Sequence, residues 1–331
     1  MNEKQFKLIL SSVSSALRKL EGFGELITND LIEKTVDKEL DELENHLKNF
    51  EFEDTDVSRL KFILRNLFDI SIDDESIVLG NPAAIRWFDN KKSKISWNHW
   101  NAYKEMLLSQ QRAPEVIDKN EEIIDQILDL SMDPTDKRYW KRKGLVMGNV
   151  QSGKTQNYLG LINKAMDAGY KVIILLGGHL VDLRNQTQER VDEGVLGRES
   201  RHLIEKTKKP TPIGVGLHGG KNVNAGTTTL ADFNKASAES LNITLSDDGD
   251  PFIFTIKKNK GVMEELYKWI VHHHFLDPEN EKKMQVPLLL IDDEADYASI
   301  NTKHHKEEVT ATNGAIRNLL SLFHRNTYVG Y

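Results

Sequence analysis

From residue 144 onward the sequence alternates short apolar segments with segments of helical periodicity, and this alternation constrains the fold more than any other feature. Segments 171–176 and 288–291 are almost entirely apolar. A strand with one exposed face would alternate apolar and polar residues, so apolar strands of this kind are typical of a parallel sheet covered on both faces by helices. We therefore predict an α/β domain with a mostly parallel sheet. We expect strands at 144–147, 171–176, 212–217, 252–256, 288–291 and 327–329, and helices at 155–168, 180–191, 262–271 and 311–323.

The first 140 residues show helical periodicity instead. In 25–48, apolar residues recur at spacings of three to five, as they do along one face of a helix. Segments 57–68, 97–108 and 115–130 repeat this pattern. The sequence thus predicts two domains: an all-helical N-terminal domain over 1–140 and the α/β domain over 141–331.

Composition excludes several classes of protein. The chain has 331 residues, no cysteine and a formal net charge of −7. A disulfide scaffold, a cysteine nucleophile and a uniformly basic nucleic-acid binder are therefore excluded. The longest apolar runs fall far short of the roughly twenty residues that a membrane-spanning helix needs, and the N-terminus lacks the apolar stretch of a signal peptide. We expect a cytoplasmic protein without membrane contacts.

One segment carries a phosphate-binding motif. Residues 148–155 read Gly-Asn-Val-Gln-Ser-Gly-Lys-Thr, which matches G-x-x-x-x-G-K-[ST] between an expected strand and an expected helix. Glycines let backbone N–H groups face a phosphate, and the helix N-terminus adds a positive dipole. Lys154 would reach the β- and γ-phosphates, and the Thr155 hydroxyl would coordinate Mg²⁺. We predict that ATP is bound by Gly148, Gln151, Ser152, Gly153, Lys154 and Thr155.

An acidic strand end complements this motif. The apolar run 286–291 is followed by Asp-Asp-Glu-Ala-Asp, and parallel sheets hold their ligands at the carboxyl ends of their strands. We predict that Asp293 holds Mg²⁺ and that Glu294 polarises the attacking water, so that Lys154 and Glu294 are the catalytic residues. A solvated acidic loop is the simpler alternative for such a run in isolation.

The residues Asp-Glu-Ala-Asp at 293–296, taken with the phosphate-binding motif, resemble the first RecA-like motor domain of superfamily-two helicases and translocases. Two further segments, 177–188 and 252–259, stand where such proteins contact the nucleic-acid backbone. The resemblance implies that Arg184, Gln188, Lys257 and Lys258 bind nucleic acid. Arg190 and Lys260 are further candidates for phosphate contacts, with ordinary surface charge as the alternative for the whole set.

The resemblance narrows to the Z-one domain family. Segments 143–158, 255–259 and 290–296 look like blocks of this family, and the similarity covers about residues 95–331. Its members are long bacterial and fungal proteins usually labelled endonucleases, and bacterial members resemble parts of phage-restriction gene clusters. Because family members are much longer, we expect this chain to be the N-terminal portion, weakly active alone. Its partners would be DNA and a second RecA-like lobe or other subunits of a restriction system, with the lobe supplying an arginine for hydrolysis.

The resemblance implies an ATP-binding and ATP-hydrolysing motor lobe, of a helicase-like or translocase-like protein, that acts on DNA in phage restriction. Two alternatives stay open. The lobe could be a nucleotide-gated binding switch that recruits a nuclease, or the chain could be an endonuclease component, as the family label says. The residues themselves do not show a nuclease site: Glu281 and Lys283 form an isolated E-x-K, and the nearby Asp277-Pro278 is in reversed order and too close to supply the upstream acid.

Overall fold

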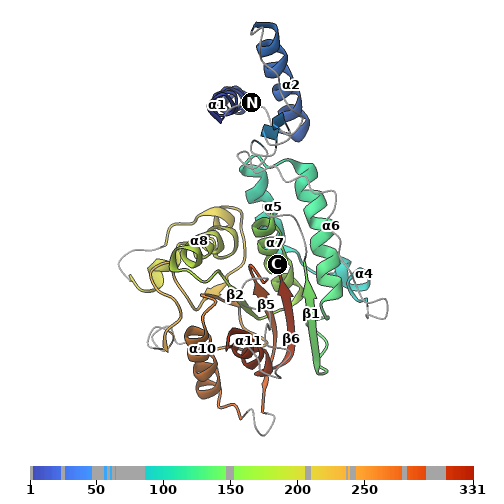
Figure 1. The fold of residues 1–331 in the computed structure, drawn as a ribbon. Helices are drawn as coiled ribbons and strands as arrows, with labels where there is room; N and C mark the ends of the chain where they lie inside the picture. The colour runs from blue at the N-terminus through green and yellow to red at the C-terminus, as the bar shows by residue number, and fades with distance from the viewer. Residues whose placement is uncertain are drawn as a thin grey trace, which may run out of the picture. The chain divides into compact units, whose positions relative to one another are not determined.

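The computed structural model describes two compact units (Figure 1). One contains the described residues of Met1–Glu75, Leu107–Asn120 and Gly148–Lys154, and the other those of Ser76–Met106, Glu121–Met147 and Thr155–Tyr331. The units therefore interleave along the sequence. The residues described are 3–23, 27–46, 56–57, 60–61, 64, 86–146, 153–205, 210–235, 238, 244–277, 282–295 and 311–331.

Helices α1 (Glu3–Gly22) and α2 (Asn29–His46) belong to the first unit. Helix α2 begins just after Thr28, whose hydroxyl accepts a hydrogen bond from the backbone N–H of Leu31 as an N-terminal cap does. Apolar residues three or four positions apart form one stripe on each helix, and the stripes are buried together. The helical periodicity predicted for 25–48 is confirmed for the described residues. The shared core contains Phe6, Ile9, Val13, Leu17, Ile32, Val36 and Leu40.

The second unit is built on a six-stranded, all-parallel sheet with the strand order β1-β6-β5-β2-β4-β3. The predicted parallel α/β architecture is thus confirmed. The strands are β1 (Trp140–Leu145), β2 (Val172–Leu176), β3 (Asn224–Ala225), β4 (Phe252–Ile256), β5 (Met284–Asp292) and β6 (Phe323–Gly330). The helices that lie wholly or partly in this unit are α4 (Phe88–Lys91), α5 (Asn98–Ser109), α6 (Pro114–Leu130), α7 (Lys154–Ala168), α8 (Val181–Val191), α10 (Lys260–His273) and α11 (Ala311–Ser321).

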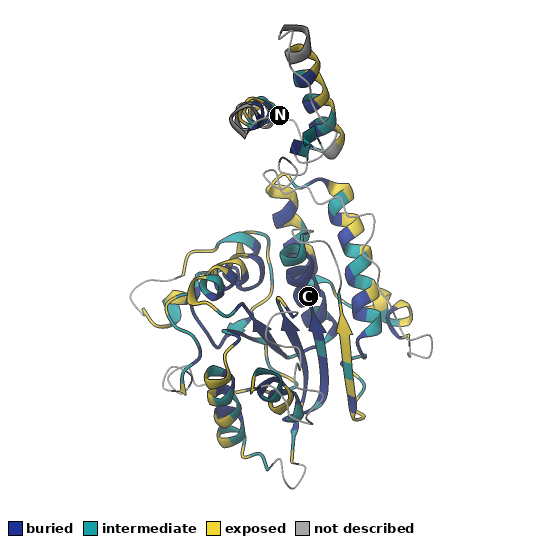
Figure 2. Ribbon diagram, viewed as in Figure 1, coloured by how far each residue is buried: buried dark blue, intermediate teal, exposed yellow. Residues whose placement is uncertain are grey.

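Both faces of the central strands are covered, as the uninterrupted apolar segments predicted. Every residue of β2 is buried, and β5 is buried over most of its length (Figure 2). Alternate residues of these strands pack with side chains of α10 and α11, such as Trp269 and Leu319. The edge strand β1 is largely exposed. Polar chemistry in the centre of the sheet is therefore confined to the ends of the strands.

One predicted strand, at 212–217, is wrong. Residues Gly214–Leu217 form a short 3-10 helix instead. Gly214 has a φ of 47°, and a Cβ added there would lie 2.1 Å from the backbone oxygen of Glu193. Only glycine allows this left-handed, close approach, so the chain turns where the apolar pattern predicts extension.

A buried lysine on α7 joins this helix to the preceding helical segments. The Lys164 ammonium is fully buried and forms ion pairs with Glu121, at 2.8 Å, and with Asp125. It also lies over the rings of Trp97 and Trp100, at 5.2 and 4.8 Å from their centroids. Part of the segment predicted as a separate helical domain therefore packs with the sheet. In the described residues, no helix has the length and apolar character needed to cross a membrane.

The first turn of α5 holds a buried histidine whose titration should affect stability. His99 is 5% exposed, and burial, with a smaller effect of Lys221, lowers its pKa to about 4. An unfolded chain would bind a proton at His99 near pH 6.5, whereas the folded chain does not. The stabilisation is therefore present above pH 6.5 and is lost as the pH falls toward 4.

The free energy of unfolding of the parent should fall between pH 7.5 and pH 5, because only the unfolded chain binds a proton at His99 there. We predict that this fall is smaller by about 1–2 kcal/mol in His99→Gln. Urea unfolding of both proteins at the two pH values measures this difference. His272→Gln, on an exposed part of α10, is the matched control and should leave the pH dependence unchanged. An identical pH dependence of the His99 variant and the parent would contradict the prediction.

Candidate functional site

The predicted phosphate-binding motif lies between β1 and α7, as its sequence context requires. Helix α7 begins at Lys154, and Gly153 precedes it with a φ of 70°, a conformation that glycine adopts without strain. The N–H groups of the first turn of such a helix have no partner within the helix, so they are available to an anion. Gly148, Gln151 and Ser152 lie outside the described residues, as does Asp296.

The register of the sheet brings the ends of five strands to one level. Gly330 of β6 pairs with Leu145 of β1 on one side and with Asp292 of β5 on the other. Leu176 of β2 continues the row, because it pairs with both Asp292 and Ile256 of β4. Neighbouring strands lie about 4.8 Å apart, so the ends of β1 and β5 are separated by roughly 10 Å. The strand that leads into the motif and the acidic strand therefore end at the same level of the sheet, one on each side of β6.

The first acid after the apolar run is a structural anchor. Asp292 is fully buried and accepts a hydrogen bond of 2.7 Å from the Tyr328 hydroxyl. Its other oxygen lies 2.7 Å from the Lys258 ammonium, in an ion pair between side chains that are 0% and 1% exposed. Burial, and then the charge of Asp292, raise the pKa of Tyr328, so its hydroxyl remains a donor.

The next two acids are displayed toward solvent by a turn. Asp293 is half-buried and Glu294 is exposed. Glu294 has a φ of 56°, which is uncommon for a residue other than glycine. The Lys258 ammonium donates to the backbone oxygens of Asp293 and Glu294, each at 2.6 Å, and so holds this turn. The structure therefore places the two predicted acids at the sheet edge, beyond a buried ion pair that supports them.

Three residues predicted to bind nucleic acid, Arg184, Gln188 and Lys258, are buried and have partners within the protein, which argues against their contact with a phosphate. Lys258 is occupied by Asp292 and the turn that follows it. Arg184 is 1% exposed and donates through Nε to the backbone oxygen of Thr255, at 2.9 Å. Gln188, one helical turn later, is fully buried and accepts a hydrogen bond from Arg184. The Arg184 and Gln188 side chains lie on the buried side of α8, and the Lys258 side chain is enclosed just beyond β4.

Arg190, on the same helix, points elsewhere. Six residues after Arg184, it lies roughly 240° further around the helix and is exposed. Its guanidinium Nη1 donates a hydrogen bond of 3.1 Å to the hydroxyl of Thr155. The sequence analysis placed Arg190 among the nucleic-acid contacts. A spacing of six residues on a helix could have predicted that Arg184 and Arg190 point in different directions. It could not have shown that Thr155 is the partner of Arg190.

A buried tyrosine connects the motif to the acidic turn. Tyr158 is fully buried, and among the described residues its hydroxyl has no hydrogen-bond partner of good geometry. Thr155 and Arg190 are near enough to influence its pKa. Burial chiefly, and then the negative charge of Asp293, raise this pKa. Thr155 and Arg190 therefore lie beside one hydroxyl on which the charge of Asp293 also acts, a relationship that the sequence did not predict.

The side-chain oxygens at this edge of the sheet are metal ligands of the kind that a hard cation such as Mg²⁺ prefers. Mg²⁺ is usually bound by one or two protein oxygens together with water and the phosphates of a substrate. The Thr155 hydroxyl and the Asp293 carboxylate are oxygen ligands of this kind, and both influence the pKa of Tyr158. In the described ranges, this edge included, His, Asp and Glu side chains do not gather in threes as a metal-binding cluster would.

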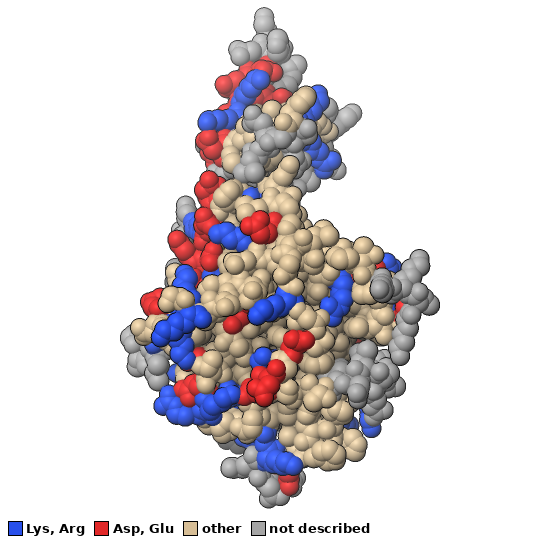
Figure 3. Space-filling model, turned by 180° about the vertical axis from the view of Figure 1, so that it is seen from behind, with Lys and Arg blue, Asp and Glu red and all other residues tan. Residues whose placement is uncertain are grey.

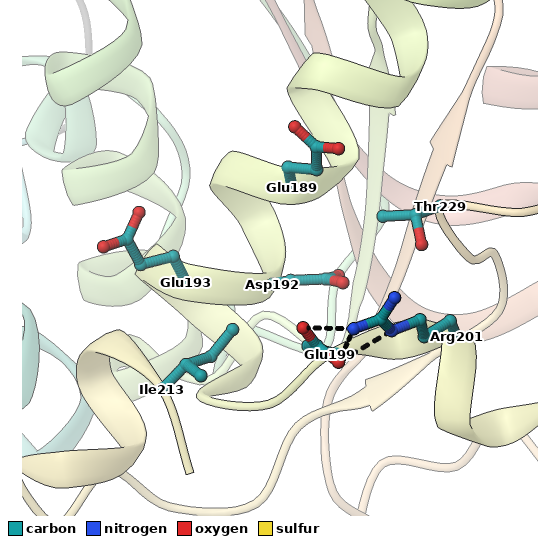
Figure 4. Close-up of a pocket in the computed structure, with 7 residues that line it drawn as sticks. All are labelled: Glu189, Asp192, Glu193, Glu199, Arg201, Ile213 and Thr229. Atoms are coloured by element: carbon teal, nitrogen blue, oxygen red, sulfur yellow. Dashed lines mark hydrogen bonds and ion pairs between the residues drawn. The ribbon is translucent and has the colours of Figure 1, made fainter. Parts of the chain in front are cut away.

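A separate cavity of about 390 Å³ lies beside the end of α8 (Figure 4). Arg201 forms an ion pair of 2.7 Å with Glu199 on its wall, and Asp192 accepts hydrogen bonds from Ser200. Its carboxylates would repel phosphate groups, so we do not assign a nucleotide to it. The lining residues are Glu189, Asp192, Glu193, Glu199, Arg201, Ile213 and Thr229.

Comparison of the chain with protein-family models, curated proteins and solved structures finds no match. The site is therefore interpreted from the geometry of this chain alone. It is an α/β protein whose parallel sheet brings a helix N-terminus and two acidic side chains to the same edge.

We predict that Lys258→Met destabilises the protein by about 3–5 kcal/mol, because it leaves the Asp292 carboxylate buried without a counter-charge. The double variant Lys258→Met with Asp292→Asn removes that charge and should regain part of the loss. Urea unfolding of the single and double variants measures the coupling. Lys260→Met, at an exposed position nearby, is the control and should change stability by less than about 0.5 kcal/mol. Additive effects of the two substitutions would contradict the role given to the ion pair.

Proposed function

We propose that the chain binds ATP with Mg²⁺ at the carboxyl edge of its sheet and hydrolyses it. The observation that carries this proposal is the pairing of Gly330 with both Leu145 and Asp292, which brings the end of the strand that leads into the phosphate-binding motif to the same level of the sheet as the acidic strand end. The ends of β1 and β5 lie roughly 10 Å apart across β6, which is close enough for groups from both to contact one bound phosphate and its metal ion beyond the sheet edge. The arrangement supports a RecA-like P-loop domain.

The residues have distinct roles in this reaction. Lys154 and the N–H groups at the start of α7 bind the β- and γ-phosphates, and they offset negative charge on them. Thr155 and Asp293 would hold the metal, which neutralises phosphate charge when it is bound. Glu294 accepts a hydrogen bond from the attacking water and orients it. The exposed position of Glu294 on the turn held by Lys258 supports this assignment.

The wider proposal is a motor lobe that acts on DNA in phage restriction, and it rests on the resemblance to superfamily-two motors and the Z-one domain family. Of the residues first predicted to bind nucleic acid, Lys257 is half-buried rather than buried. It follows Ile256, which belongs to the row of strand ends at the nucleotide edge. Lys260 is exposed nearby and pairs with Glu264 at 3.4 Å. On the face shown in Figure 3, basic and acidic side chains are intermixed, so any DNA contact there would be local.

We predict that Lys154→Ala abolishes or severely weakens binding of ATP with Mg²⁺, because the backbone alone leaves the γ-phosphate charge uncompensated. Glu294→Gln should bind ATP like the parent and lose hydrolysis, since an amide cannot accept the proton of water. Calorimetric titration and phosphate release measure the two properties. ATP turnover by Glu294→Gln at the parent's rate would refute the role of Glu294.

We predict that the double charge reversal Lys257→Glu with Lys260→Glu weakens DNA binding and lowers its salt dependence. The slope should fall by about one unit for each phosphate that the variant no longer neutralises. Fluorescence anisotropy with a labelled duplex at several salt concentrations measures both quantities. A matched double reversal at Lys34 and Lys38, exposed on α2, is the control for net charge. An equal effect of the two double variants would show that Lys257 and Lys260 do not bind DNA specifically.

A further inference from the structure

Arg190 is a cation at the nucleotide edge that the proposed reaction has not yet used. It lies in the last turn of α8, is exposed, and donates through Nη1 to the Thr155 hydroxyl at 3.1 Å. Arginine has five N–H donors in a planar fork, and this hydrogen bond uses one of them. In the part of the chain that the structure describes, the guanidinium forms no ion pair with a carboxylate.

The surroundings of Arg190 are those of a phosphate subsite. Thr155 is the second residue of α7, so its hydrogen bond brings the guanidinium next to the N-terminus of that helix. Tyr158 is buried below them, and its hydroxyl, without a well-placed partner in the described residues, lies close to both Thr155 and Arg190. A phosphate oxygen at this point would meet a guanidinium fork, which matches phosphate geometry better than a point charge does.

We propose that Arg190 binds the terminal phosphate of the nucleotide, so that an arginine of this same chain contributes to recognising ATP over ADP. The inference rests on the proposed nucleotide site and adds to it a residue outside the motif. The alternative is that Arg190 only forms a surface hydrogen bond with Thr155 and does not contact a nucleotide. The sequence analysis expected the arginine of the reaction from a second lobe, whereas the structure points to one that α8 supplies.

The test compares affinities for ATP and ADP, each with Mg²⁺, by calorimetric titration of the parent, Arg190→Ala and Arg190→Lys. If Arg190 binds the γ-phosphate, the alanine variant should lose roughly ten- to a hundredfold in ATP affinity, as expected for charge-assisted hydrogen bonds. Its ADP affinity should stay within about twofold, so the ratio of the two affinities falls. The lysine variant keeps the charge and should give an intermediate ratio. Arg201→Ala, at an exposed arginine of the separate cavity, is the matched control and should keep the parent's ratio.

The outcomes separate the two proposals. A parent that prefers ATP while Arg190→Ala keeps the same ATP-to-ADP ratio overturns the role of Arg190 and leaves the nucleotide site standing. A parent that binds neither nucleotide overturns the nucleotide site and this inference with it. Equal losses for ATP and ADP in Arg190→Ala would also refute the inference, because the side chain would then act on the whole site and not on the terminal phosphate.

Discussion

The ion pair between Lys258 and Asp292 is the interaction on which the candidate site depends. It joins the residues just beyond β4 to the last residue of β5, and Tyr328 adds a hydrogen bond from β6 to the same carboxylate. Burying two charged side chains away from water costs free energy unless each is paired with an opposite charge and hydrogen-bonded. Here the ammonium is matched by the carboxylate and by two backbone oxygens of the following turn. The same contacts that satisfy the buried charge therefore fix the turn that displays Asp293 and Glu294.

The parallel sheet makes such an arrangement possible. Its central strands are apolar on both faces, so polar groups concentrate where the strands end. All strands run in the same direction, and their carboxyl ends meet at one edge. The pairing of Gly330 with Leu145 and Asp292 then sets the separation between the end of β1 and the end of β5. A glycine suits this place, because a Cβ on Gly330 would lie 2.8 Å from the Cβ of Ala295 in the acidic turn.

Helix α8 shows how one element serves two purposes. Its inner side carries Arg184 and Gln188, which form a buried hydrogen-bond network with the backbone of β4 and with Asp192. Its outer side presents Arg190 to Thr155. The inner arginine stabilises the packing of the helix, and the outer one is available for chemistry. The same residue type therefore has opposite roles, depending on its rotation about the helix axis.

The sequence alone determined the parallel α/β architecture and the place of the motif between a strand and a helix, because uninterrupted apolar strands and a G-x-x-x-x-G-K-T segment are local patterns. It also put Asp293 and Glu294 at a strand end. Only the tertiary structure decided which charges are buried, since the partners of Lys258 and Arg184 lie far away in the sequence. The turn at Gly214 and the meeting of Arg190 with Thr155 likewise depend on contacts between distant segments. Periodicity reports which side of an element is apolar, but it does not report what that side meets.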